Sequence, residues 1–175
     1  FSQNFNRYTY CLNNPLVYKD ENGEFIIAFF SHFIKGLVKK QNPFKTGWQG
    51  VKNEYMLLKG LFSGGSQRTK SRFTRELPQT TAGFWASYFS NLFGFTRKVS
   101  SWGGATVSQL EPAFLKGSKA FTLGSYIMGG SSIEADPDNV IFQHEYGHYL
   151  QSQEMGWSYL FKVAIPSLKS AAGDG

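Results

Sequence analysis

The segment DPDNVIFQHEYGHYLQSQEMGW, residues 136–157, constrains the fold of this 175-residue chain more than any other part of it. Its boundaries are those of an α-helix. Asp136 suits the N-cap, Pro137 suits the first helical position, and Gly156 suits the position just after the last turn. The pattern therefore predicts a helix over residues 137–155.

Two histidines lie four residues apart in this helix, so His144 and His148 project from one face, one turn apart. Imidazoles at this spacing can bind one Zn²⁺ ion. The carboxylate of Glu145, next to the first histidine, is then placed to act as the general base that deprotonates the metal-activated water. With Cys11 as its one cysteine, the chain offers no sulfur-based zinc site. The alternative is a chance pair of histidines that faces the core or the solvent.

The sequence HEYGH resembles the signature of the zincin metallopeptidases, residue by residue at His144, Glu145 and His148. The resemblance implies an α+β fold in which an edge strand precedes the active-site helix and binds substrate in extended form. Residues 120–128, AFTLGSYIM, alternate in the manner of a half-buried strand and are the candidate for this substrate edge. An internal strand without substrate contact is the open alternative.

A catalytic zinc site with one open position needs a third protein ligand. The extended motif of the metzincins, one branch of the zincins, requires Gly at position 151 and His at position 154, where this chain has Gln151 and Glu154. Glu154 is a candidate ligand only if the helix breaks near Gln151. Gluzincins take a Glu from a later helix, and Asp174 is the one acid after Glu154. The third ligand is otherwise expected beyond Gly175.

Residues 1–24 alternate polar and aromatic side chains and contain two turn signals, which predicts short strands. The stretch FNRYTYCLNNPLVYKDENGE resembles the end of the core associated with RHS or YD repeats, whose usual form is close to RY-Y--NNP--Y-DP-G. The residues on that pattern are Arg7, Tyr8, Tyr10, Asn13, Asn14, Pro15, Tyr18, Asp20 and Gly23. In some members of that family the core cleaves itself just beyond this motif. Glu21 replaces the usual proline here, so the resemblance does not extend to that cleavage. The resemblance implies a β-shell followed by a variable toxin or effector domain.

Residues 25–38, FIIAFFSHFIKGLV, form a dense apolar run that is too short to span a bilayer and predicts a core helix in which His32 is packed and is not a ligand. The remaining predicted elements, in chain order, are a short helix at 53–61, a break at 63–66, an exposed basic loop at 67–80, a buried helix at 84–95 and a turn at 102–104.

The net charge of +6 is distributed unevenly, since residues 35–98 hold 12 Lys or Arg and only two acids, Glu54 and Glu76. A basic surface attracts nucleic acid, anionic lipid or an acidic protein without specifying which of them. We interpret it as a solvated face, because the basic residues are scattered and show no signature of specific nucleic-acid binding. No transmembrane segment is predicted. The absence of an initial Met or a signal pattern indicates a piece of a longer protein.

These observations predict an α+β, zincin-like fold, with residues 1–24 as the terminal strands of an RHS-associated core and residues 25–175 as an effector domain truncated at its C-terminus. The expected function is that of a Zn²⁺-dependent metallopeptidase toxin or effector, secreted or at the cell surface within a larger bacterial RHS protein and delivered into a target cell. Its expected partners are a peptide or protein substrate and an immunity protein. The alternatives are a non-catalytic RHS-associated interaction module with a vestigial metal site and a basic partner-binding surface, or a hydrolase of non-peptide amides.

Overall fold

The computed structural model describes residues 24–113 and 119–167, so the expected RHS-like strands at 1–23 lie outside the described residues. The elements are α2 (Glu24–Val38), α3 (Pro43–Leu61), α4 (Ser66–Arg72), α5 (Leu77–Leu92), β1 (Thr96–Trp102), β2 (Ala105–Leu110), β3 (Ala120–Leu123), β4 (Tyr126–Gly129), α6 (Val140–Met155) and the π-helix η2 (Leu160–Ala164). Helices and one small mixed sheet confirm the predicted α+β class.

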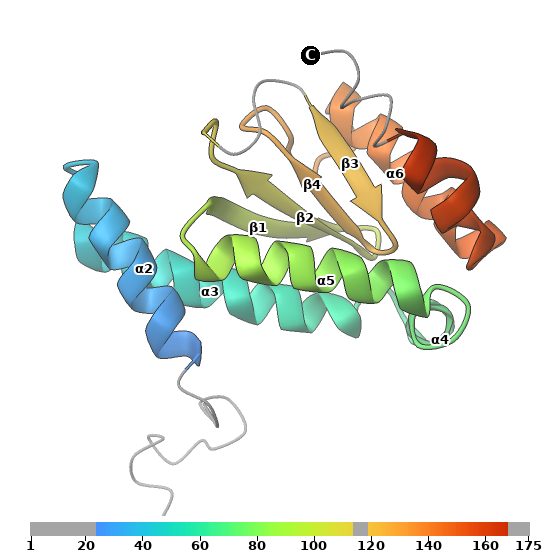
Figure 1. The fold of residues 1–175 in the computed structure, drawn as a ribbon, viewed down its shortest axis with the longest axis horizontal. Coiled ribbons are helices and arrows are strands. Elements are labelled where there is room, and N and C mark those ends of the chain that lie inside the picture. The colour runs from blue at the N-terminus through green and yellow to red at the C-terminus, as the bar shows by residue number, and fades with distance from the viewer. Residues whose placement is uncertain (1–23, 114–118, 168–175) are drawn as a thin grey trace, which may run out of the picture.

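The sheet has the strand order β1-β2-β4-β3, with β2 parallel to β4 and the two outer pairs antiparallel. Helices cover both faces (Figure 1). On one face Tyr126 packs with Leu57 of α3, and on the other face Ile127 packs with Phe142 of α6. Adjacent residues of β4 thus point to opposite sides, as they must in a strand. The core therefore has two layers, one between the sheet and α3 and α5, the other between the sheet and α6.

The prediction of one strand over residues 120–128 was wrong, because the segment is a hairpin of β3 and β4. Gly124 has φ +58° and forms a two-residue turn with Ser125. A positive φ at the first turn position only is typical of a type II′ turn. A Cβ at Gly124 would lie 2.3 Å from Oγ1 of Thr80, so α5 also requires glycine here. The turn places β3 at an edge of the sheet and β4 inside it, so residues 120–128 combine the expected edge strand with the internal strand that was its alternative.

Residues 67–80 are not the exposed basic loop that their composition predicted. They form most of α4 and the start of α5, and Arg72, Glu76 and Gln79 are fully buried. The guanidinium of Arg72 donates to Oγ of Ser125 at 2.6 Å and to the carbonyl of Leu61 at 3.2 Å. Such bonds offset part of the cost of removing a charge from water. This arginine therefore joins the end of α3 to the turn of the β3–β4 hairpin.

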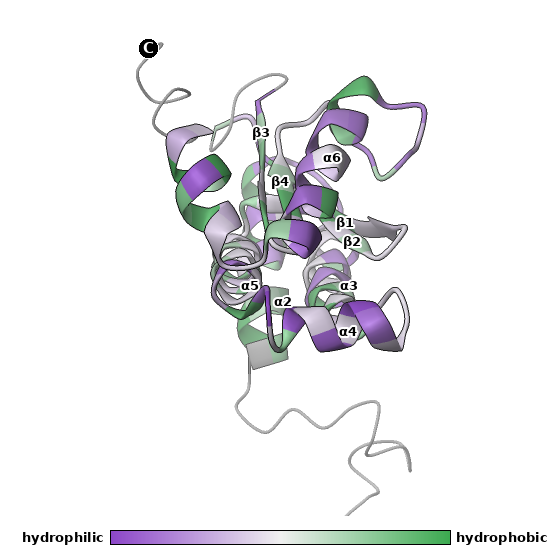
Figure 2. Cartoon of the chain, turned by 90° about the vertical axis from the view of Figure 1, so that its right-hand side faces the viewer, coloured by the Kyte–Doolittle hydropathy of each residue, from purple (hydrophilic) through white to green (hydrophobic). Residues whose placement is uncertain are grey.

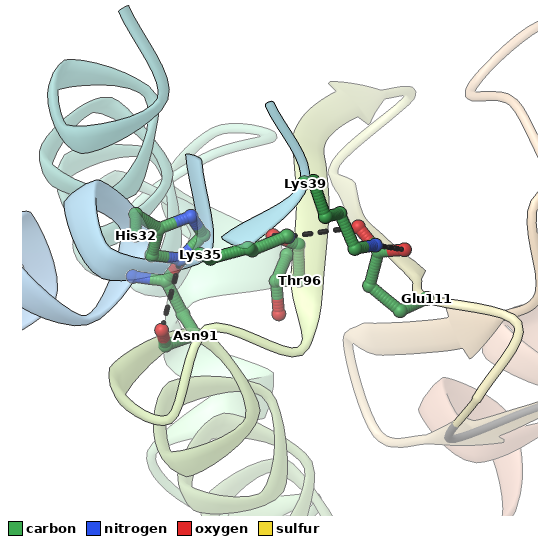
Figure 3. Close-up of polar contacts among 6 residues, drawn as sticks. All are labelled: His32, Lys35, Lys39, Asn91, Thr96 and Glu111. Carbon is green, nitrogen blue, oxygen red and sulfur yellow. Dashed lines mark hydrogen bonds and ion pairs between the residues drawn. The ribbon is translucent and has the colours of Figure 1, made fainter. Parts of the chain in front are cut away.

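Helix α2 confirms the helix expected at 25–38, but only one of its faces is buried, so it is not a core helix throughout. His32 is 2% exposed, and its Nε2 donates to the carbonyl of Asn91 at 3.0 Å (Figure 3). Lys35 and Lys39 form ion pairs with Glu111 at 2.8 and 2.7 Å. The prediction that His32 is a packed histidine is confirmed, and these contacts hold α2 against the body of the protein.

Acid is expected to destabilise the protein through His32. Burial, and then the nearby Lys35, lower the pKa of His32 from 6.5 to about 4. The unfolded chain therefore binds one more proton between these pH values, so stability falls as the pH drops from 6.5 towards 4. The full difference corresponds to about 3 kcal/mol. Urea unfolding at pH 7 and pH 4.5 should show a smaller loss in His32→Gln than in the wild type, and equal losses would contradict this assignment.

Candidate metal centre

Helix α6 presents the HEYGH sequence, and its N-cap differs from the predicted one. The side-chain oxygen of Asn139 accepts a hydrogen bond from the backbone N–H of Phe142 at 2.9 Å. The carboxylate of Asp136, predicted as the cap, instead accepts from the N–H of Asp138 in the turn before the helix. The helix therefore begins three residues later than predicted. Its end is as predicted, since Gly156 has φ +57° there.

The imidazoles of His144 and His148 lie side by side on this helix. Their ring centroids are 4.8 Å apart and the ring planes are perpendicular. His144 is exposed and His148 is half-buried. A Cβ built at Gly147, between them in sequence, would meet no atom within 4 Å. Among the described residues, no neighbouring element packs closely there, and the pair is open on that side.

The ring of His148 is oriented by its own helix. Its Nδ1 forms a hydrogen bond with Oε1 of Gln151 at 2.9 Å, one turn further along. A partner at one ring nitrogen fixes the orientation of the ring and, where that nitrogen carries the proton, leaves the other nitrogen free for a metal ion. Such a partner is characteristic of histidines that bind metals, so Gln151 supports the pair although it replaces the metzincin glycine.

The carboxylate of Glu145 points away from solvent, towards the edge strand β3. Its side chain is 6% exposed, and its Oε2 accepts a hydrogen bond of 2.6 Å from the hydroxyl of Thr122. Oε1 makes no hydrogen bond among the residues that the structure describes. The acid, which follows His144 in the chain, is thus held against the strand expected to bind substrate.

Tyr159, the residue just before η2, also contacts Thr122 of β3. The hydroxyl of Tyr159, which is 1% exposed, donates to the carbonyl of Thr122 at 3.2 Å. Burial, and then the nearby Glu145, raise the pKa of Tyr159 well above its usual range, so this hydroxyl stays protonated. Sequence reasoning missed both Thr122 and Tyr159 as residues that support this site. The strand alternation gave some signal for Thr122, and no signal pointed to Tyr159.

The third predicted ligand does not join the pair. Helix α6 runs unbroken through Gln151, so Glu154 lies about 240° around the helix from His148. Glu154 is exposed, and its backbone carbonyl accepts from Arg75. Within residues 24–113 and 119–167, no three His, Cys, Asp or Glu side chains are grouped so that they could hold a metal ion. The donor set therefore fits two of the three ligands of a catalytic zinc ion.

Tyr126 of β4 and Tyr146 of α6 both donate their hydroxyl protons to backbone carbonyls, so neither hydroxyl is directed at a bound substrate. The hydroxyl of Tyr126 donates to the carbonyl of Leu57 on the opposite face of the sheet. The hydroxyl of Tyr146 donates to the carbonyl of Gly103 at 3.1 Å, and its ring packs against Trp102. Both residues also pack against other aromatic rings, Tyr126 against Phe84 and Tyr146 against Trp102.

No family model matches the chain, and no curated protein or solved structure is significantly similar to it. In the part of the chain that the structure describes, no helix is both long and apolar enough to cross a membrane.

Proposed function

We propose that this chain is a zinc-dependent hydrolase of the zincin type, in which His144 and His148 hold the ion. One arrangement carries the proposal. The ring centroids of His144 and His148 lie 4.8 Å apart, and no described atom lies within 4 Å of the Cβ position of Gly147, between them in sequence. Glu145, which follows His144, directs its carboxylate to the edge strand β3. A zinc ion supplies two effects when bound, since it lowers the pKa of its water and polarises a carbonyl. The third ligand comes from outside the described residues.

Glu145 acts as the general base in this proposal. Its Oε2 is occupied by the hydroxyl of Thr122, so Oε1 is the oxygen that takes a proton from the attacking water. After the tetrahedral adduct forms, the same carboxylic acid returns the proton to the departing amine. Packing against β3 keeps the carboxylate in one orientation, so less conformational entropy is lost when the reactive geometry forms.

The substrate class in this proposal is a peptide bound in extended form along β3, which lies at the sheet edge as the zincin resemblance implies. The carbonyl of Thr122 already accepts from Tyr159, so a substrate strand pairs with other backbone groups of β3 or displaces that hydroxyl. The RHS-like sequence at residues 5–24 supports the further proposal that the chain is the effector end of a secreted or surface bacterial protein. In the producing cell, an immunity protein would inhibit it.

Thr122 is a positioning residue for Glu145, and its removal is expected to reduce kcat more than it changes KM. Thr122→Val keeps the shape and removes the donor, so Oε2 loses its 2.6 Å partner and the carboxylate can turn. We expect a loss in kcat of about 10-fold, in keeping with the loss of one hydrogen bond to a charged group. Thr122→Ser restores the hydroxyl and should restore kcat. A Val variant with wild-type kcat would exclude this role.

The experiment that tests the proposed function is hydrolysis of casein, an unfolded protein, by the chain loaded with zinc. Cleavage should appear with zinc, disappear with a chelator and return when zinc is added back. A chain that carries bound zinc and leaves casein intact would contradict the peptidase proposal. Salt-sensitive binding to an acidic partner, unaffected by the chelator, would instead favour the non-catalytic interaction module.

A further inference from the structure

The outward face of α3 carries lysines and aromatic rings in strict alternation. Going along the helix and one residue past its end, this Lys–aromatic stripe consists of Lys45, Trp48, Lys52, Tyr55, Lys59 and Phe62. Residues three or four positions apart share one face of a helix. All six are exposed, the three aromatic residues by 53% to 68%. Aromatic surface exposed to this extent is characteristic of an interaction site.

Ring contacts connect this stripe to the outer face of α2. Phe29 packs against Trp48 at 5.7 Å and against Phe30 at 5.7 Å, and Phe33 packs against Phe44 at 5.2 Å. The exposed residues of that outer face are Ile26, Ile27, Phe30, Ile34, Leu37 and Val38. Figure 1 shows α2 and the start of α3 projecting past the sheet, with no described element over the outer face of α2. The two helices thus share one continuous apolar surface.

The exposed charges of this surface have a single sign over residues 25–62. The two acids within residues 35–98, Glu54 and Glu76, are 2% and 0% exposed, so neither carboxylate reaches the surface. Glu111 is taken up by its ion pairs with two lysines of α2. Among the residues whose side chains the structure describes, the exposed acids are Glu134, Asp136, Asp138 and Glu154, all in α6 or in the segment that leads to it. Over residues 25–62, every exposed charged side chain is therefore basic.

We propose that α2 and α3 dock on an anionic lipid surface. Lysines attract the headgroups, aromatic rings settle at the level of the headgroups, and the aliphatic side chains of α2 enter the boundary of the acyl region. Charge complementarity alone would also suit a nucleic acid. The Ile, Leu and Val side chains of α2 argue for lipid, because they neither stack on bases nor bond to them.

Docking in this orientation leaves the histidine pair clear of the bilayer. Helices α3 and α5 lie on one side of the sheet and α6 on the other, as Figure 2 shows from the side. The proposal rests on the α2–α3 surface alone, so it holds whether or not the chain is a hydrolase.

The test is co-sedimentation of the protein with vesicles of phosphatidylcholine alone or mixed in equal parts with phosphatidylglycerol. Binding is expected only with phosphatidylglycerol, and it should weaken with salt. Lys52→Gln/Lys59→Gln should bind about 30-fold more weakly, because each lysine near an anionic surface contributes about five-fold. The matched control is Lys119→Gln/Lys162→Gln, two exposed lysines outside α2 and α3 with the same loss of charge, which should bind as the wild type does.

Fluorescence of Trp48 separates insertion from simple attraction. A blue shift is expected on adding the anionic vesicles, and Trp48→Phe should remove most of it while far-UV circular dichroism stays unchanged. Four results would each overturn the proposal: equal binding to both kinds of vesicle, equal losses in the two double variants, a duplex DNA bound in place of vesicles, or a dimer formed through this surface that vesicles do not dissociate.

Discussion

Glu145→Gln is expected to lower the rate of casein hydrolysis by about 100- to 10,000-fold, the range for loss of a general base. The amide cannot accept the proton, yet its carbonyl oxygen can still take the hydrogen bond from Thr122, so the local structure should persist. Zinc binding should be unchanged, because the carboxylate is not a ligand. Initial rates and zinc content measured on the same preparation check both halves of this expectation.

The matched control for this variant is Glu154→Gln, which removes the same charge from the same helix. Glu154 is exposed and lies away from the histidine pair, so activity and zinc content should both match the wild type. Equal losses in the two variants would mean that the charge of α6, and not the position of Glu145, governs activity. Loss of zinc in Glu154→Gln alone would mean that Glu154 is the third ligand after all.

The sequence predicted α6 and the shared face of its two histidines well because the signals are local. The spacing of His144 and His148 fixes their common face through the helix period alone, and Gly156 ends the helix through its own backbone freedom. The N-cap was misplaced because Asp136 and Asn139 are both good caps at the start of the same pattern. Which one caps the helix depends on where the preceding turn ends, and that turn is set by contacts beyond the helix.

The errors elsewhere come from interactions between segments that are distant in sequence. Basic composition suggested a loop at 67–80. Arg72 is nevertheless buried, because Ser125 and the carbonyl of Leu61 accept hydrogen bonds from its guanidinium. Strands β1 and β2 were not predicted at all. The alternation over residues 120–128 was read correctly as strand, yet the turn at Gly124 was missed, and only the approach of Thr80 from α5 shows why glycine is required there.

The same limit applies to the surface and to the site. Nothing local in the sequence shows that Glu54 and Glu76 are buried, so composition predicts a largely basic segment but does not show that all of its exposed charges are basic. Likewise, the contact between Thr122 and Glu145 joins residues 23 positions apart and depends on how β3 packs against α6. The adjacent histidines could be predicted from one helical turn, whereas the contact that holds Glu145 required the fold.

His148→Ala is expected to lower zinc affinity by about 100-fold, since dividing the roughly 10–16 kcal/mol of a four-ligand zinc site gives about 3 kcal/mol per ligand. His148 is half-buried and makes its one side-chain hydrogen bond, among the described residues, with Gln151 of the same helix. The fold should therefore survive the change. Isothermal titration with zinc gives the affinity, and far-UV circular dichroism checks the helix content.

The control for this variant is His32→Gln, which removes the histidine that is buried against Asn91, away from the pair on α6. It should bind zinc with the affinity and stoichiometry of the wild type. If His148→Ala also kept wild-type affinity, the two imidazoles on α6 would not share an ion. Glu145 would then have no activated water to deprotonate, and the hydrolase proposal would fail at its first step, whatever residue supplies the remaining ligand.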